Sequence, residues 1–261
     1  MSEKQGPRVL IIDIETSPLL VWSFGLHEQN IALNQVHKDW HLMAVAAKWL
    51  DEDKIFYMDQ RDKKDGSDDK AICLAVWSLL DEADIVVGQN SKSFDIKKLN
   101  SRFAIHDISS PSSFKHQDTL CMARKHFGFT SNKLEYLTAQ LNTKYKKLDH
   151  GEFPGMELWK QCLAGNQAAW KCMKTYNVHD VLSTEELYAT LRKWDNTIDF
   201  SVYREDNKIV CACGHAKFKK NGFFWSATGK FQRYKCEKCD RETRSKINLL
   251  SKEKKESLKR S

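Results

Sequence analysis

The stretch Val9-Leu10-Ile11-Ile12-Asp13-Ile14-Glu15-Thr16 decides the fold of this chain. It is an apolar, β-rich run of the kind expected for a central strand, and the Thr16-Ser17-Pro18 break follows it. Because side chains alternate along a strand, Asp13 and Glu15 share one face while Ile12 and Ile14 occupy the other. The sequence therefore predicts a buried strand that presents two carboxylates together.

Outward from this strand, the pattern predicts further strands first and interleaved helices afterwards. A hairpin is expected from residues 41–50 and 55–58, and Ile85-Val86-Val87 before Gly88 indicates another buried strand. Helical periodicity is found at residues 70–80, 96–103, 118–127, 134–141 and 167–194. This order predicts an α/β fold with a mixed sheet flanked by helices.

Two later segments add acidic residues that folding could bring to the first pair. Asp95 stands in a strand-to-helix loop, and Tyr176 lies four positions before Asp180 on one helix face. Crowded carboxylates repel one another, and hard divalent cations such as Mg²⁺ or Mn²⁺ prefer oxygen ligands. We therefore expect one metal site formed by Asp13, Glu15, Asp95 and Asp180.

These motifs resemble those of the DEDD superfamily of 3′-to-5′ exonucleases, which share a ribonuclease H-like fold. The first motif is Asp13-Ile14-Glu15-Thr16, and the second runs from Gly88-Gln89-Asn90 to Phe94-Asp95. The third is Tyr176-Asn177-Val178-His179-Asp180, which matches the tyrosine subclass because Thr175 stands where the other subclass has histidine. The resemblance covers roughly residues 8–194.

The resemblance implies a chemistry and a substrate. Two Mg²⁺ or Mn²⁺ ions on the four carboxylates would activate a water and stabilise the 3′-oxygen leaving group of a phosphodiester. Tyr176 would orient that water, because a phenol stays protonated at neutral pH. The expected substrate is nucleic acid with a free 3′ end, DNA favoured over RNA, whose terminal nucleotide would contact Asn90 and Phe94.

Three residues near these motifs have alternative interpretations. Phe94 fits a place in the core as well as it fits a nucleotide contact. Asp118 before Thr119 is expected to be a helix N-cap beside the site and not a metal ligand. His179 is rotated by about 100° from Asp180 on a helix, so a structural role is preferred over that of a general base.

Four of the eight cysteines form two close pairs near the C-terminus. Cys211-Ala212-Cys213 and Cys236-Glu237-Lys238-Cys239 suit a tetrahedral zinc site, and residues 219–236 resemble zinc ribbons of insertion-sequence transposases. The first pair has one intervening residue where those ribbons usually have two, so His215 could replace Cys211. Zinc would be structural, because so small a module does not fold without its ion.

The other four cysteines stand alone in apolar or helical contexts. We expect buried free thiols at Cys73, Cys121, Cys162 and Cys172.

The C-terminal part is also the basic part of the chain. Residues 201–261 contain 17 Lys and Arg against 7 Asp and Glu, a net charge of +10, which leaves −3 for residues 1–200. Such a basic segment is typical either of a region that binds a polyanion or of a solvated tail that aids solubility. The aromatic residues of the ribbon could stack on bases or form its own small core. The expected phosphate contacts are Lys219, Lys220, Lys230 and Arg233.

We expect an exonuclease domain at residues 1–195, a linker at 196–207, a zinc ribbon at 208–248 and a charged tail at 249–261. The tail is expected to be disordered or a frayed helix. Two other functions stay open: a catalytically silent nucleic-acid-binding scaffold, and a proofreading subunit whose ribbon contacts a DNA polymerase or another replication protein. No signal peptide or membrane span fits the start of the chain, so we expect a cytoplasmic or other reducing compartment.

Overall fold

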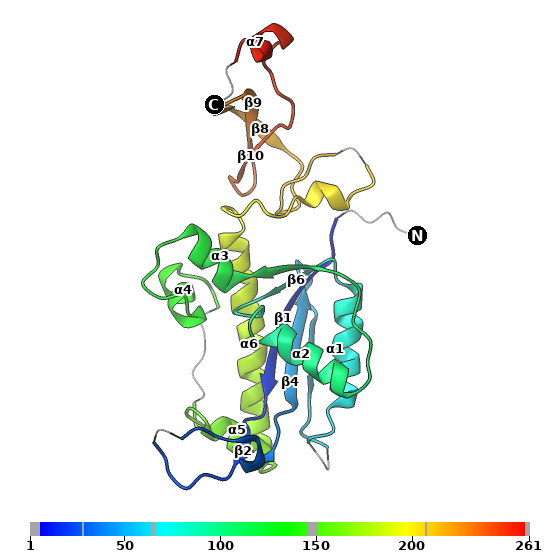
Figure 1. Cartoon of the computed structure of the whole chain (residues 1–261), viewed down its shortest axis with the longest axis vertical. Helices are drawn as coiled ribbons and strands as arrows, with labels where there is room; N and C mark the ends of the chain where they lie inside the picture. Colours follow the sequence, from blue (N-terminus) through cyan, green and yellow to red (C-terminus); the bar gives the residue numbers. More distant parts are fainter. Residues whose placement is uncertain (1–5, 28, 64–65, 146–150, 207, 259–261) are drawn as a thin grey trace. The chain divides into compact units, whose positions relative to one another are not determined.

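The computed structural model divides the chain into two compact units, drawn in Figure 1. The larger unit comprises residues 8–188, and the smaller one comprises residues 1–7 with 189–261. The division falls inside helix α6 (Gln167–Leu191), whereas the expected nuclease domain ends at residue 195. The residues that the structure describes are 6–27, 29–63, 66–145, 151–206 and 208–258.

A five-stranded mixed sheet forms the centre of the larger unit, with the order β5-β4-β1-β6-β7. The predicted central strand is β1 (Val9–Thr16), which pairs antiparallel with β4 (Leu42–Trp49). β4 continues antiparallel to β5 (Ile55–Asp59), so the predicted hairpin is present. On the other side, β6 (Ile85–Gly88) and β7 (Lys115–Asp118) follow parallel to β1. The predicted α/β fold with a mixed sheet is confirmed.

Helices connect the strands and cover the sheet. The predicted helices are present as α1 (Lys70–Glu82), α2 (Asp95–Ile105), α3 (Thr119–His126), α4 (Leu134–Gln140) and α6. A further helix, α5 (Glu157–Leu163), precedes α6. Among the described residues, no helix combines the length and the apolar character that a membrane span requires.

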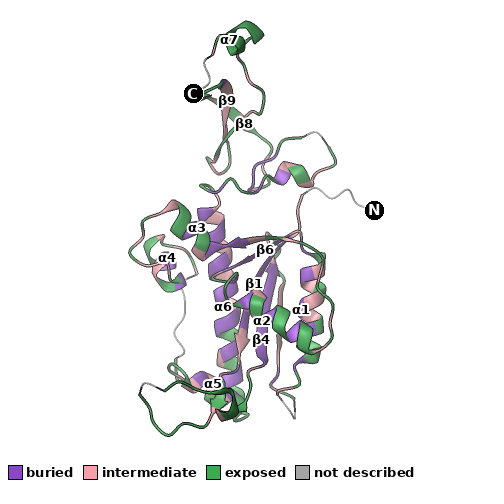
Figure 2. Cartoon of the chain, viewed as in Figure 1, coloured by how far each residue is buried: buried purple, intermediate pink, exposed green. Residues whose placement is uncertain are grey.

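The two faces of the sheet bury different clusters of side chains. Leu10, Ile12 and Ile14 of β1 pack with residues of α1 and α2 in one cluster. On the other face, Met43 and Ala44 of β4 pack with residues of α5 and α6. Figure 2 shows the buried residues along β1, β4 and α6. Because β1 alternates, its carboxylates point away from the α1–α2 cluster.

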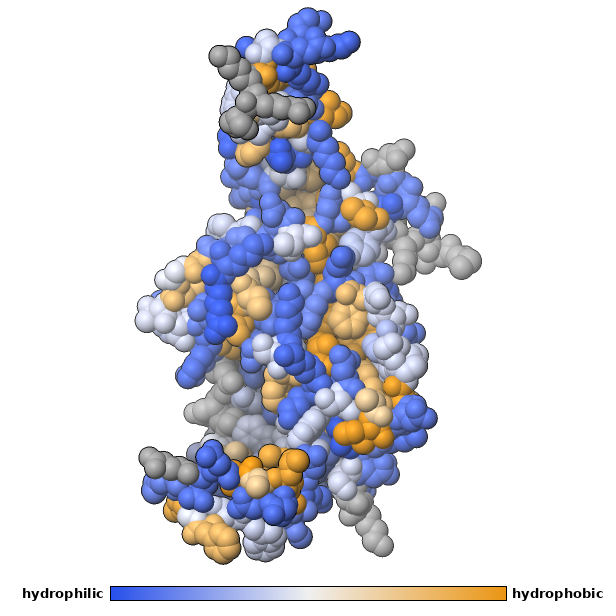
Figure 3. All heavy atoms as spheres, in the orientation of Figure 1, coloured by the Kyte–Doolittle hydropathy of each residue, from blue (hydrophilic) through white to orange (hydrophobic). Residues whose placement is uncertain are grey.

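The connection between β1 and β4 carries exposed apolar side chains. It contains the short antiparallel pair β2 (Leu20–Val21) and β3 (Val36–Lys38), with the 3₁₀ helix η1 (Leu33–Gln35) before β3. Trp22 is 68% exposed and Phe24 is fully exposed. In Figure 3, hydrophobic residues reach the surface at the end of the unit that Figure 1 labels β2. Exposed apolar groups of this density are typical of interaction surfaces.

The smaller unit contains a three-stranded antiparallel sheet with the order β10-β9-β8. Its strands are β8 (Phe218–Ser226), β9 (Gly229–Cys236) and β10 (Glu242–Arg244). The expected linker contains the 3₁₀ helix η2 (Phe200–Tyr203), which Asp199 caps by accepting from Ser201 N and in which Phe200 is buried. The tail contains the short helix α7 (Lys252–Glu256), whose N-cap is Ser251, and residues 259–261 lie outside the described ones.

The four lone cysteines differ in burial. Cys73 and Cys162 are buried, as expected, and Cys172 is half-buried. Cys121 is exposed, so the expectation of a buried thiol is wrong there. It lies on α3, whose buried residues are Thr119, Met122 and Ala123, so its own position faces solvent.

A buried ion pair ties α1, α2 and β4 together. Asp69, fully buried, accepts hydrogen bonds from Arg102 Nε and Leu42 N, both at 2.7 Å, and also contacts His106. Burial alone would raise the pKa of Asp69, but the hydrogen bonds from Arg102 and Leu42 lower it overall. Cys73 lies close to the same group. Because the guanidinium of Arg102 already neutralises the carboxylate, this cluster is an ion pair and not a cation site.

Asp69→Ala is expected to destabilise the larger unit by about 3–5 kcal/mol, because it leaves Arg102 buried without its counter-charge. Urea unfolding followed by circular dichroism measures this. Asp68→Ala is the matched control, since the neighbouring Asp68 is exposed and its removal should cost less than about 0.5 kcal/mol. Equal losses in the two variants would contradict the assignment.

Candidate functional site

The acidic residues and the tyrosine of the three motifs lie together in one pocket of the larger unit. The pocket has a volume of about 690 Å³. It is formed by β1, the loop after β6, the start of α2 and the middle of α6. Its lining includes all seven residues expected at the site, namely Asp13, Glu15, Asn90, Phe94, Asp95, Tyr176 and Asp180.

Hydrogen bonds hold the three motifs against one another. The backbone N–H of Ile14 donates to Asp95 Oδ1 at 3.1 Å, which joins β1 to the start of α2. The fully buried Asn177 donates through Nδ2 to Asp13 Oδ2 at 2.6 Å and to the Asp13 carbonyl at 3.1 Å. Sequence reasoning missed Asn177, although it stands inside the third motif. It fixes the Asp13 carboxylate relative to α6.

The pocket concentrates negative charge. Burial raises the pKa of Asp13 well above its ordinary value, and the carboxylates of Asp180, Asp95 and Glu15 raise it further. Burial raises the pKa of Asp95 to about 7, although backbone hydrogen bonds, including that of Ile14, oppose the shift. A cation among these groups would remove the repulsion. Four carboxylates form a donor set that fits a hard divalent ion such as Mg²⁺ or Mn²⁺.

Tyr176 is held in its protonated form. Burial raises the pKa of its phenol first, and the charges of Asp180, Glu15 and Asp13 and a hydrogen bond with Asp180 raise it further. A phenol in this environment can donate or accept a hydrogen bond but does not release its proton near neutral pH. His179 does not line the pocket; its ring packs edge-on against Tyr145, with 5.5 Å between centroids.

Asp118 positions the loop that carries Asn90. This buried carboxylate caps α3 by accepting from Leu120 N at 2.9 Å, and it also accepts from Asn90 N at 2.9 Å and Lys92 N at 3.0 Å. Asn90 has a φ of 60°, a left-handed conformation that an asparagine tolerates better than most residues. Gly88 is needed at the start of this loop, because a Cβ there would meet Ser91 Cβ at 2.5 Å.

The other wall of the pocket comes from α3, α4 and the loop between them, and sequence reasoning missed it. Two exposed cations, Arg124 and Lys133, lie on this wall with the polar residues Thr130, Ser131 and Asn132. Gln89 Nε2 donates to the Asn132 carbonyl at 2.9 Å and so links the wall to the loop after β6. Nothing in the sequence pattern places this loop opposite the carboxylates, because the approach is entirely tertiary.

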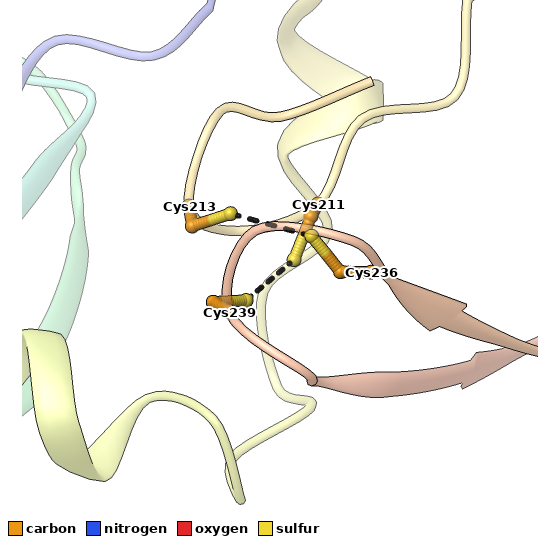
Figure 4. Close-up of side chains that lie close together, drawn as sticks. All are labelled: Cys211, Cys213, Cys236 and Cys239. Carbon is orange, nitrogen blue, oxygen red and sulfur yellow. Dashed lines mark hydrogen bonds between the residues drawn. The ribbon is translucent and has the colours of Figure 1, made fainter. Parts of the chain in front are cut away.

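The smaller unit brings the four clustered cysteines together (Figure 4). The Sγ atoms of Cys211 and Cys239 lie 3.5 Å apart, and those of Cys213 and Cys236 lie 3.6 Å apart. Tetrahedral zinc with Zn–S distances of about 2.3 Å requires sulfur atoms roughly 3.8 Å apart. The sulfur set therefore fits zinc.

His215 does not belong to this four-residue group; its carbonyl oxygen accepts from Cys211 N at 2.8 Å. The thiols differ electrostatically. Burial opposes ionisation of Cys236, but backbone hydrogen bonds from Cys239 and Lys238 lower its pKa overall. Burial raises the pKa of Cys213. The geometry favours Cys211 over His215 as the fourth ligand.

The basic residues of the ribbon occupy different environments. Lys219 and Lys220 are exposed on β8. Lys230 Nζ lies 4.0 Å from the centroid of Phe223 and 4.8 Å from that of Trp225. Arg233 donates to the Asn221 carbonyl at 3.0 Å, so part of its guanidinium serves the hairpin itself. Three aromatic side chains of β8, Phe223, Phe224 and Trp225, are exposed, whereas Phe218 at its start is half-buried.

Comparisons with known proteins bear on the larger unit. Residues 10–192 match the family model of the RNase H superfamily. Among solved structures, the chain is similar to the family B DNA polymerase from the hyperthermophilic archaeon Pyrobaculum calidifontis, with a TM-score of 0.49 and 16% identity. That match covers 72% of this chain and 25% of the polymerase chain, so the chain spans about a quarter of that protein. No curated protein matches the chain.

Asp118→Ala is expected to loosen the Asn90 loop, because four backbone N–H groups, those of Asn90, Lys92, Leu120 and Cys121, lose their common acceptor. Each unsatisfied buried group costs about 1–3 kcal/mol. Hydrogen exchange measured by mass spectrometry should show faster exchange at residues 88–92 and 119–122. Asp118→Asn, which keeps one acceptor oxygen, should show a smaller effect. Unchanged exchange in both variants would refute the positioning role.

Proposed function

Because the chain belongs to the RNase H superfamily, we propose that its larger unit is a metal-dependent 3′-to-5′ exonuclease of the DEDD type, tyrosine subclass. The substrate is nucleic acid with a free 3′ end, DNA favoured. The main support is the convergence of Asp13, Glu15, Asp95 and Asp180 in one pocket. Family membership alone would support a nuclease without a direction of cleavage.

These four carboxylates are the proposed ligands of two Mg²⁺ or Mn²⁺ ions. When bound, such ions supply charge stabilisation for a phosphodiester under attack and a water of lowered pKa. Asn177 keeps the Asp13 carboxylate oriented through its 2.6 Å hydrogen bond. Ile14 N does the same for Asp95. The protein thus holds its ligands in place before any ion or substrate arrives.

Tyr176 is the proposed positioning group for the attacking water. Its phenol stays protonated, because burial and three carboxylates raise its pKa. It therefore orients by hydrogen bonding and does not remove a proton. Asn90 and Phe94 line the same pocket and are the proposed contacts of the 3′-terminal nucleotide.

Arg124 and Lys133 extend this proposal to the substrate phosphates. They supply positive charge on the wall built by α3 and α4, which also carries the carboxylate of Glu135. A strand in the pocket would then have its reacting phosphate towards the carboxylates and neighbouring phosphates towards these cations. The polar side chains between them offer further hydrogen bonds.

Purified protein with Mg²⁺ or Mn²⁺ is expected to shorten end-labelled oligonucleotides from a free 3′ end, and chelation by EDTA should stop it. Asp13→Asn should lower the rate by at least about 10³-fold, because one ligand charge is lost while the size is kept. Asp53→Asn, in the exposed turn between β4 and β5, is the matched control and should leave the rate unchanged. DNA and RNA oligomers with free and blocked 3′ ends complete the assay.

Two results would contradict the proposal in different ways. Undiminished activity of Asp13→Asn would refute the site. Equal degradation of blocked and free ends would refute the direction.

For the smaller unit we propose a structural zinc ion on Cys211, Cys213, Cys236 and Cys239 and a role in nucleic-acid binding. The close approach of the four sulfur atoms supports the zinc. The exposed Lys219 and Lys220 and the exposed aromatic residues beside Lys230 support contact with phosphates and bases. Contact of the ribbon with a DNA polymerase or another replication protein is the alternative, which co-purification would test.

The purified chain is expected to contain one zinc ion per molecule, which inductively coupled plasma mass spectrometry measures. Cys239→Ser should lose most of it, since three thiolates bind zinc more weakly than four. Cys121→Ser is the matched control, because that exposed cysteine lies outside the cluster. If the wild-type protein contains no zinc and all eight of its thiols react with a thiol reagent, the assignment of a zinc site is wrong.

A further inference from the structure

A second pocket lies in the larger unit, and no role described above involves it. Its volume is also about 690 Å³, within the range of pockets that enclose small ligands. It is formed by the residues that follow β1, by η1 and β3, by the residues before β4, and by α2. Its lining includes Ser17, Pro18, Leu19, Leu33, Trp40 and Lys98.

Two segments of the chain run from the carboxylate pocket into this second pocket. Glu15 lines the first pocket, and Ser17, two residues later, lines the second. On α2, Asp95 lines the first pocket, and Lys98, three positions further on, lines the second. Lys98 Nζ also lies 5.8 Å from the ring centroid of Phe94, which belongs to the first pocket. A ligand chain that leaves the carboxylates along α2 meets the second pocket within about one helical turn.

The lining combines an aromatic ring, aliphatic side chains and an ammonium group. Lys98 Nζ lies 3.7 Å from the centroid of the Trp40 ring, and Arg102 approaches the same ring at 5.7 Å. Pro18, Leu19 and Leu33 supply aliphatic surface. An aromatic surface beside a cation is how proteins bind the bases and phosphates of single strands.

One acidic residue limits what the pocket can bind. Asp39 lies on the same lining and balances the charge of Lys98. A cluster of phosphates would be repelled by this carboxylate. A single base, which is uncharged, with one phosphate at Lys98 fits the charges present.

We propose that the second pocket holds an unpaired nucleobase of the same strand whose 3′ end lies in the carboxylate pocket. Trp40 and the aliphatic residues pack against the base, and Lys98 contacts the adjacent phosphate. This inference rests on the proposed nuclease function. A dinucleotide fills only the carboxylate pocket, whereas a longer strand reaches both pockets, so the enzyme discriminates strands by length. The two chain segments that line both pockets favour a nucleotide of the same strand over a peptide as the occupant.

Binding is tested with the full chain carrying Asp13→Asn in Mg²⁺, so that bound strands stay intact. Oligodeoxynucleotides of six residues carry the fluorescent base 2-aminopurine at each position in turn. Fluorescence should change most at the third or fourth position from the 3′ end. Adding Trp40→Ala should abolish the change at that position and weaken binding about tenfold, whereas Trp40→Phe should largely restore both. Trp22→Ala, an exposed tryptophan outside both pockets, is the matched control and should match the parent.

Kinetics with otherwise wild-type protein give the second readout. Trp40→Ala should lower kcat/KM about tenfold for the six-residue strand and leave the dinucleotide unaffected. Lys98→Gln should reduce the slope of log affinity against log salt by about 0.7, the loss of one phosphate contact on a single strand. Thermal unfolding of each variant verifies that the fold is retained.

The outcomes separate this inference from the function on which it rests. The protein could hydrolyse strands while Trp40→Ala changes neither the dependence of kcat/KM on strand length nor the 2-aminopurine fluorescence. That result overturns the proposal for the second pocket alone. An equal loss on dinucleotide and long strand overturns it too, because Trp40 would then act through the fold. Absence of hydrolysis, with the Trp40-dependent fluorescence change intact, refutes the nuclease and supports the base-binding pocket.

Discussion

The crowding of carboxylates beside a buried central strand is the constraint on which the rest of the larger unit depends. The positions of Asp13 and Glu15 are fixed by the sheet, because β1 pairs with β4 on one side and with β6 on the other. Asp95 and Asp180 come to the same place from two helices. Burial and mutual repulsion raise the pKa of Asp13, so this arrangement costs free energy in the absence of a cation. Buried groups with strongly shifted pKa values are concentrated at the functional sites of proteins.

Neutral hydrogen-bond donors hold the acidic groups in position. Asn177 and the backbone N–H of Ile14 bind the carboxylates directly. Asp118 acts one step away, since it organises the backbone of the loop that presents Asn90. Among the described residues that line the pocket, the positive side chains are Arg124 and Lys133, which belong to the wall built by α3 and α4.

Periodicity predicted most of the larger unit, because its strands and helices bury apolar residues at regular spacing. β1, β4, β6 and the long α6 are examples. β7 could not be predicted: its sequence Lys-His-Gln-Asp has no apolar run, and it forms because β6 offers it a partner. The grouping of the acidic residues followed from motif order. The cationic wall and the second pocket depend on contacts between distant segments, which local pattern does not encode.

The smaller unit follows different physics. In its sheet, β8 exposes Phe223, Phe224 and Trp225, while the segment before the sheet buries Phe200 and Val210. The four sulfur atoms lie together, and Lys230 and Arg244 lie over aromatic rings of the sheet. Spacing of the cysteines predicted the cluster, since ligand pairs are a local feature. Cys121 shows the limit of such reasoning, because exposure is decided by which face of α3 meets the sheet.

The span of the site along the chain, from Asp13 to Asp180, has a consequence for biosynthesis. A ribosome releases the acidic strand β1 well before the residues of α6. Until Asn177 and Asp180 have emerged, the nascent polypeptide lacks one of the four carboxylates and the amide that orients Asp13. A growing chain therefore assembles the complete acidic pocket only after α6 has formed and packed against β1.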